Sequence, residues 1–367
     1  SAFAAQKLKE RDKDREQGAE RRHALYYAGL RQAKRSINYV PEGALAQLDR
    51  EVENVRAALE RSLKEVWDDT AVDCCWSLMA TLWQHGLLVD SIDAGRSILS
   101  LELPPERRLE VLLNLGWLAS NGGRFEEAEQ AYLEAEPLAA NIGDLTEHGR
   151  ARNGLGTLQN RLGKYSDAIR NFTEAVRIAE GLGLARNASV SLTGLGNAYL
   201  ELGRWDEARE SYERSIHLVQ GGHDKITEAG SLFNLGRLLH RQEDRSGAKK
   251  LYLRAKRMLG QASDHVVLFT SILGQLGLLE AELDHFPSAS QYIDEARAIL
   301  SATDYRPALI ELICLESQVA HLRGEPASAA ALFLEAEDML QSLRLATGGG
   351  IQRRVDELRE LINLPAP

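Results

Sequence analysis

Two arginines in one segment of the chain have the spacing of an anion-binding pair. Arg237 and Arg241 lie four residues apart in "GSLFNLGRLLHRQ", and in a helix this spacing places both side chains on one face. Each guanidinium can hold a carboxylate through two parallel hydrogen bonds. His240 lies beside them and is weaker evidence, because an ordinary surface histidine explains it equally well. The pattern indicates binding rather than a reaction.

The residue patterns of common catalytic and metal sites are absent from the sequence. No Gly-x-x-x-x-Gly-Lys-Ser/Thr run is present to cradle a phosphate, and no Gly-x-Ser-x-Gly turn to present a nucleophile. The nine histidines and three cysteines form no His-Glu-x-x-His or Cys-x-x-Cys pair. His223 and Asp224 are adjacent and could share a metal, but a surface turn explains them better. We therefore expect a non-catalytic chain with no metal and no cofactor of its own.

A period of 40 residues organises the middle of the chain. Leu-Gly pairs recur at four places, and each is followed at fixed distances by an alanine, an aromatic residue and a second small residue. The pairs are Leu115-Gly116, Leu155-Gly156, Leu195-Gly196 and Leu235-Gly236. The residues that follow are Ala128, Ala168, Ala208 and Ala248, then Tyr132, Phe172, Tyr212 and Tyr252, then Ala135, Ala175, Ser215 and Ala255. A strict period of this length is typical of repeat proteins, which bind partners along a surface.

Each repeat has the pattern of two helices joined by a tight turn. Apolar or small residues recur at spacings of three and four, which places them on one helical face. A glycine marks each of three turns, at Gly123, Gly163 and Gly203. The aromatic residue is expected to fill the space between neighbouring hairpins, which must stack because one hairpin cannot bury its apolar face. Trp205 takes the turn position of Phe125 and Tyr165 and is accordingly assigned to packing.

Weaker units flank these four repeats. Leu276-Gly277 begins a fifth unit, Phe333 belongs to a sixth, and residues 74–99 have the pattern of a degenerate first hairpin. Atypical outer units are expected because they cap a repeat array. The fourth unit departs at its turn, where Glu243 replaces the glycine and Arg245 the aromatic residue.

These residues are similar to the tetratricopeptide-repeat signature, with a period of 40 residues rather than the usual 34. Longer-helix variants of this kind occur in signalling scaffolds and bacterial sensors. The resemblance covers residues 72–340 and implies an all-α chain, a right-handed α-solenoid of about seven hairpins with N-terminal capping helices. It also implies that the first helix of each hairpin lines a concave groove. The residues that it places there include Trp117, Arg150, Asn153, Asn160, Arg161, Asn197, Phe233, Arg237, His240 and Arg241.

The expected groove is rich in asparagine and arginine although the chain is acidic. An asparagine offers both a donor and an acceptor to an extended peptide backbone, and an arginine binds a carboxylate. Trp117 and Phe233 would add apolar contacts. We expect the groove to bind a peptide, a protein segment or a small anionic ligand. The alternative is a solvated helix face, on which polar residues are ordinary.

The first 66 residues do not follow the period and resemble a different family. The matching stretches are Phe3 to Leu8, Arg21 to Tyr27 and Leu48 to Leu59. In this order they are similar to the junction between winged helix and repeat array in bacterial STAND regulators, which are signalling ATPases with an NB-ARC-type module. The resemblance implies that residues 1–8 end a preceding domain and that an ATPase, with its ATP and Mg, lies upstream of Ser1. The alternative is that these helices only cap the solenoid.

The expected organisation has three parts. Residues 1–66 form a helical junction or cap, residues 67–345 form the superhelix, and residues 346–367 form a capping helix and tail. The leading hypothesis for the function is a ligand- or partner-sensing domain of a bacterial multidomain ATPase or transcription regulator. The alternatives are a free-standing scaffold or adaptor for protein–protein interaction and an accessory domain that positions a substrate for an enzyme elsewhere in the polypeptide.

Charge and composition limit the partners. The net charge of -10 disfavours nucleic acid, because phosphate binding needs a basic face. Three cysteines, two of them adjacent, form no disulfide framework and fit a reducing cytoplasm. No apolar run approaches the length of a membrane span, so we expect no membrane insertion.

Overall fold

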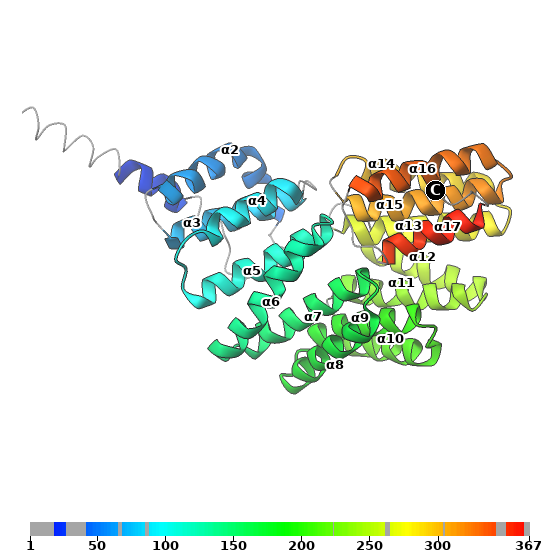
Figure 1. The fold of residues 1–367 in the computed structure, drawn as a ribbon, viewed down its shortest axis with the longest axis horizontal. Helices are drawn as coiled ribbons and strands as arrows, with labels where there is room; N and C mark the ends of the chain where they lie inside the picture. Colours follow the sequence, from blue (N-terminus) through cyan, green and yellow to red (C-terminus); the bar gives the residue numbers. More distant parts are fainter. Residues whose placement is uncertain are drawn as a thin grey trace, which may run out of the picture. The chain divides into compact units, whose positions relative to one another are not determined.

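The computed structural model describes residues 18–26, 42–64, 68–84, 88–222, 224–260, 265–303, 305–342 and 350–362. Within these ranges all regular secondary structure is helical, and the helices follow one another as hairpins (Figure 1). The all-α solenoid expected from the sequence is confirmed. The chain divides into two compact units, Ser1–Leu118 and Ala119–Pro367. No helix in the described ranges is long and apolar enough to cross a membrane.

The first unit contains a helix over residues 18–26 and three further complete helices. These are α2 (Glu42–Lys64), α3 (Asp68–Gln84) and α4 (Leu88–Leu99), and most of α5 (Pro105–Asn121) also belongs to this unit. Helix α2 packs on α3, and Val55 and Leu59 of α2 are buried. The stretch Phe3 to Leu8, which carries part of the resemblance to STAND regulators, lies outside the described residues.

The second unit begins inside α5 and contains twelve further labelled helices. They are α6 (Phe125–Ile142), α7 (Leu145–Arg161), α8 (Tyr165–Gly181), α9 (Ala185–Glu201), α10 (Trp205–Val219), α11 (Lys225–Arg241), α12 (Arg245–Leu259), α13 (Val266–Glu282), α14 (Phe286–Leu300), α15 (Arg306–Leu322), α16 (Pro326–Ser342) and α17 (Gly350–Leu361). From α7 to α16, each odd-numbered helix packs on the even-numbered helix after it and on the next odd-numbered helix. With α3/α4 and α5/α6, the chain order gives the seven helix pairs that the sequence predicts.

The periodic residues form the core between hairpins. Ala168 and Ala208 are fully buried, and the ring of Phe172 is only 1% exposed. This ring packs on Gly156 of its own hairpin, where an added Cβ would lie 3.0 Å from it, and against Gly194 of the next hairpin. The expectation that the aromatic residue fills the space between neighbouring hairpins is therefore confirmed.

The turns inside the hairpins adopt the left-handed backbone conformation. Gly163 and Gly203 have φ angles of 72° and 71°, which glycine adopts without steric cost. Glu243 replaces the glycine in the fourth repeat and keeps the conformation, with a φ angle of 64°. The unusual sequence therefore changes the residue at this turn but not the path of the backbone.

The assignment of Trp205 to packing is wrong. The side chains of Phe125 and Tyr165 are 7% and 6% exposed, whereas Trp205 is 42% exposed. In the next repeat Arg245 stands at the corresponding turn position. Its guanidinium pairs with Glu282 at 2.9 Å and provides no aromatic neighbour for the indole.

Helix α17 continues the row of inner helices after the last hairpin. Its apolar residues Ile351, Val355 and Leu358 are 5%, 1% and 0% exposed, and the helix packs on α15 and α16. It also reaches α7, near the start of the second unit. At that contact Arg353 donates to the carbonyl of Gly163 at 3.4 Å, across 190 residues of sequence. The helix thus packs on the last hairpin and also contacts the turn between α7 and α8.

Candidate functional site

The inner helices of the second unit and α17 line a cavity of about 300 Å³ that is open to solvent on one side. Residues of α9, α11, α13 and α15 form its walls, together with Tyr165 at the start of α8. The lining residues are Tyr165, Glu201, Arg237, His240, Arg241, Gln275, Leu278, Glu282, Glu311, Cys314, Leu315, Gln318, Arg353, Arg354 and Glu357. Most of them come from the first helices of the hairpins, which the tetratricopeptide resemblance placed on the inner side.

A carboxylate between two arginines forms the centre of one wall. Glu201 accepts hydrogen bonds from Arg237 at 3.3 Å and from Arg241 at 3.1 and 3.2 Å. Burial raises the pKa of Glu201, but the guanidiniums of Arg237, Arg241 and Arg354 outweigh this effect and hold the pKa below its ordinary value. Glu201 is therefore ionised at neutral pH, and an anionic ligand would compete with it for the two arginines.

A second carboxylate, Glu282, holds His240 in place. His240 Nε2 lies 3.0 Å from Glu282 Oε2, and Arg245 donates to the same oxygen at 2.9 Å. These two partners lower the pKa of Glu282 although its burial acts in the opposite direction. His240 is thus fixed at the cavity wall by a hydrogen bond to Glu282.

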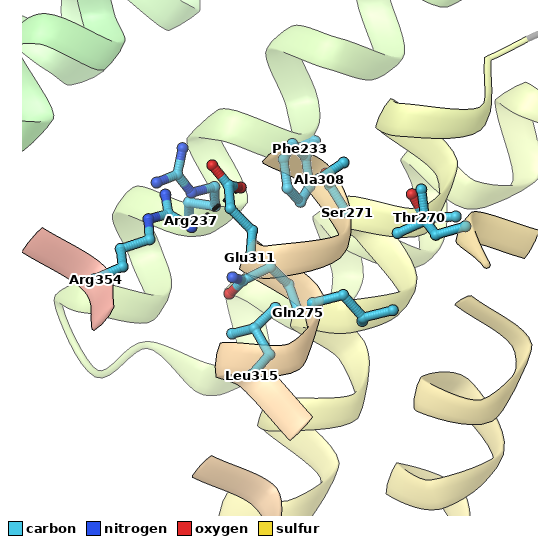
Figure 2. Close-up of a pocket in the computed structure, with 11 residues that line it drawn as sticks. Phe233, Arg237, Thr270, Ser271, Gln275, Ala308, Glu311, Leu315 and Arg354 are labelled. Carbon is cyan, nitrogen blue, oxygen red and sulfur yellow. Dashed lines mark hydrogen bonds and ion pairs between the residues drawn. The ribbon is translucent and has the colours of Figure 1, made fainter. Parts of the chain in front are cut away.

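A smaller hollow of about 50 Å³ adjoins the cavity. Phe233, which is 7% exposed, lines it together with Leu312 and Leu315. In Figure 2 the side chains of Arg237, Glu311 and Arg354 converge at one end of this hollow. Arg354 pairs with Glu311 at 3.3 Å. The two spaces share these three charged residues and offer a polar region beside an apolar one.

Arg237 occupies the position that Asn197 has in the preceding repeat. In the preceding repeat the hydroxyl of Tyr212 donates to Asn197 Oδ1 at 2.8 Å. Forty residues later Arg237 stands in place of Asn197, and the buried hydroxyl of Tyr252 has no hydrogen-bond partner. An unpaired buried hydroxyl destabilises a fold. The arginine is therefore not explained by the packing of its own repeat, which is typical of a functional position.

The expected groove residues fall into two groups. Arg237, His240 and Arg241 meet at the cavity, and Phe233 lines the adjoining hollow. Two of the asparagines instead connect repeats: Asn153 accepts from Ser191 at 3.0 Å, and Asn160 donates to the carbonyl of Gly194 at 3.0 Å. Asn197 accepts from Tyr212 within its own hairpin. A binding role for the asparagines stays a prediction.

The other expected residues do not line the cavity either. Arg161 donates to the carbonyl of Ser120 at 2.5 Å and to Asn121 at 3.0 Å, and Arg150 pairs with Glu147 at 3.1 Å. Trp117 belongs to the first unit. A binding role for these three residues likewise stays a prediction.

Some of the lining residues were missed by the sequence analysis. Glu311, Cys314 and Gln318 occupy groove positions of the sixth repeat and could have been found by extending the same spacing. Arg353 and Arg354 lie on α17, outside the repeats, where no periodic signal exists.

Cys314 is the cysteine that lines the cavity. Burial raises the pKa of the Cys314 thiol to about 12, so the thiol is neutral at pH 7 and a poor nucleophile. Within the described ranges no group of three or more His, Cys, Asp and Glu residues could hold a metal ion.

The fold and the cavity together define a helical-repeat solenoid with a polar site on its inner side. Residues 107–181 and 187–261 match the family model of the tetratricopeptide repeat. These residues thus carry tetratricopeptide repeats, and the tetratricopeptide resemblance stated from the sequence is confirmed. A search of curated proteins gave no match.

Solved structures share this fold over most of the chain. A Rap protein complexed with competence and sporulation factor is 11% identical with a TM-score of 0.60, over 88% of this chain and 97% of that chain. NprR in complex with its cognate peptide NprX is 16% identical with a TM-score of 0.59, over 88% and 99%. A STAND protein with a tetratricopeptide repeat sensor, from Pyrococcus horikoshii, is 15% identical with a TM-score of 0.52. That match covers 88% of this chain and 49% of the STAND protein, so this chain spans about half of its length.

Proposed function

We propose that the chain is a non-catalytic sensor domain that binds a ligand in the inner cavity of its second unit. The ligand is a peptide, a protein segment or a small anionic molecule. The observation that carries the proposal is the placement of Arg237 and Arg241 at the cavity wall, where they share Glu201. An arginine pair held by one carboxylate is oriented in advance, so that little side-chain entropy is lost when a ligand binds.

The structural relatives support a peptide as the first ligand class to test. Two of the structures with this fold are a Rap protein complexed with competence and sporulation factor and NprR in complex with its cognate peptide NprX. In this chain the cavity combines the donors and acceptors that a peptide backbone requires, in Gln275 and Gln318, with the apolar side chains of Leu278 and Leu315.

We further propose that the sensor belongs to a cytoplasmic bacterial signalling ATPase or transcription regulator. The sequence motifs before the repeats support this context, and so does the fold shared with a STAND protein whose sensor consists of tetratricopeptide repeats. Ligand binding would favour one arrangement of the repeats and so shift the regulator between resting and active states. Reading the coding sequence upstream of Ser1 tests the context, because a P-loop followed by a winged helix is expected there.

The binding function is tested with peptides and one substituted arginine. The full chain is mixed with a pool of random hexapeptides, and retained peptides are identified by mass spectrometry after size-exclusion chromatography. Arg241→Gln is expected to reduce retention at least ten-fold, because it removes a charge from the cavity wall. Arg170→Gln is the matched control, since the side chain of Arg170 is 78% exposed on α8 and is absent from the cavity lining. If wild-type protein retains no peptide, or if Arg241→Gln retains as much as wild type, the cavity is not a peptide site.

A further inference from the structure

Tyr165 and Arg353 form a corner of the cavity in which the arginine has no carboxylate partner among the described residues. Tyr165 is 6% exposed and lines the cavity, and among the described residues its hydroxyl makes no hydrogen bond. Arg353 lies over its ring, with 4.7 Å between the guanidinium carbon and the ring centre. The one hydrogen bond of Arg353 within the described part goes to the carbonyl of Gly163 at 3.4 Å, and no carboxylate there is close enough to pair with it. The corner therefore presents a cation and a hydroxyl donor side by side.

The four arginines and four glutamates that line the cavity are unevenly paired. Arg237 and Arg241 share the single carboxylate of Glu201. Arg354 pairs with Glu311, and Arg353 has no counter-ion in the described part of the chain.

Two further glutamates line the cavity but do not neutralise the corner. Glu282 is held by His240 and Arg245, and Glu357 acts on Arg354 from the same helix. An added negative charge at the corner could therefore pair with Arg353, which has no carboxylate partner in the described part of the chain.

The hydroxyl of Tyr165 stays protonated beside these charges. Its burial raises the pKa of Tyr165, as does Glu201, whereas Arg353, Arg354 and Arg241 act in the opposite direction with a smaller total effect. A neutral phenol donates a hydrogen bond, and a carboxylate is a strong acceptor for it.

We propose that this corner binds the C-terminal carboxylate of a peptide, with Arg353 as its cation and the Tyr165 hydroxyl as its donor. The inference rests on the proposed function of the cavity and specifies which end of the peptide is recognised. The rest of the peptide then extends along α11, α13 and α15, toward the hollow lined by Phe233 and Leu312. Helix α17 is thereby part of the binding site as well as a cap, because it supplies Arg353.

The experiment compares two pools of random hexapeptides that differ only at the C-terminus. One pool ends in a free carboxylate and the other in an amide. Wild-type full chain is expected to retain the acid pool at least ten-fold more than the amide pool. Tyr165→Phe keeps the ring under Arg353 and removes only the hydroxyl, and Arg353→Gln removes the charge. Both variants are expected to lose most of the preference for the acid pool.

Arg359→Gln is the matched control on the same helix. Arg359 pairs with Glu337 and lies over the ring of Phe333, with 5.2 Å between the guanidinium carbon and the ring centre, and it does not line the cavity. It is expected to keep the preference for the acid pool. If Arg359→Gln loses the preference as fully as Arg353→Gln, the effect comes from the docking of α17 and the direct role of Arg353 is wrong.

The remaining outcomes separate this inference from the proposed function. Equal retention of the two pools by wild-type protein overturns the carboxylate site and leaves peptide binding in place. Retention of neither pool overturns both. N-acetylalanine carries the same carboxylate without a peptide chain, and if it displaces the acid pool at equal carboxylate concentration, the ligand is a small carboxylate rather than a peptide end.

Discussion

Tyr212 and Tyr252 occupy the same position in adjacent repeats, and both side chains are fully buried. The hydroxyl of Tyr212 donates to Asn197, while that of Tyr252 has no acceptor because Arg237 has replaced the asparagine. The comparison isolates the effect of one substitution between two otherwise similar environments. It indicates that the fourth repeat gives up a hydrogen bond in order to place a cation at the cavity.

The two tyrosines are therefore expected to respond in opposite ways to loss of the hydroxyl. Tyr212→Phe should lower the free energy of unfolding by about 0.5–1.5 kcal/mol, because Asn197 loses its donor. Tyr252→Phe should leave stability unchanged or increase it, because it removes an unpaired buried hydroxyl. Chemical denaturation of both variants measures the difference. An equal loss in both would show that Tyr252 has an acceptor in solution.

The ionisation of Glu201 makes the stability of the second unit depend on pH. Its pKa is lower in the folded chain than in the unfolded chain, so its ion pairs stabilise the fold fully above the unfolded value of about 4.3. This contribution is lost as the pH falls from there through the folded pKa. Wild-type protein should therefore lose more stability between pH 6 and pH 3 than Glu201→Gln, as measured by thermal melting. Parallel curves for the two proteins would contradict the lowered pKa.

At the scale of the helix, two glycines on neighbouring inner helices have different surroundings. A Cβ at Gly196 would lie 2.5 Å from the ring of Tyr212, whereas a Cβ at Gly230 would have Leu268 at 3.8 Å as its nearest neighbour. Gly196→Ala is expected to destabilise the chain by about 1–3 kcal/mol through overpacking. Gly230→Ala should be neutral or stabilise by up to about 1 kcal/mol, because alanine favours the helix. Melting temperatures that fall equally in both variants would contradict this packing.

Helix α17 is expected to undock without unfolding the rest of the array. Leu358 is fully buried, and Leu358→Ala should release α17 because an end helix of a solenoid contacts few neighbours. Hydrogen exchange should accelerate in residues 350–361 and stay unchanged in α9 to α11. Glu360→Ala, an exposed change on the same helix, is the control. Faster exchange throughout the second unit would show that α17 holds the whole array together.

Most of the elements, but only part of the site, could be predicted from the sequence. The 40-residue period identified the hairpins because the packing of each hairpin requires the same residue types at the positions of Gly156, Ala168 and Phe172. It also found Arg237 and Arg241, whose spacing follows the helix. It could not show that Asn153 and Asn160 bridge repeats, since a polar residue on an inner helix has the same pattern whether it faces a neighbour or a ligand. Arg353 was missed because its place depends on a tertiary contact of α17.

At the scale of the whole molecule, the net charge disfavours binding to nucleic acid. With a net charge of -10, and with the cavity arginines mostly paired, the chain should not bind a short DNA duplex at physiological salt. Fluorescence anisotropy of a labelled duplex measures this. Binding whose affinity falls steeply with added salt would contradict the expectation and reveal a basic surface.

The contact between Arg353 and the turn at Gly163 also has a mechanical consequence. A solenoid ordinarily stretches and recoils like a spring, because each hairpin touches only its neighbours. Here residues 190 positions apart in sequence touch, so α17 is tied to the turn between α7 and α8. While this contact is formed, the distance between α17 and the turn at Gly163 is fixed, and so is the pitch of the hairpins between them. A ligand that breaks or strengthens this contact would therefore change the length of the solenoid. A domain attached to either end of the solenoid would be displaced by that change.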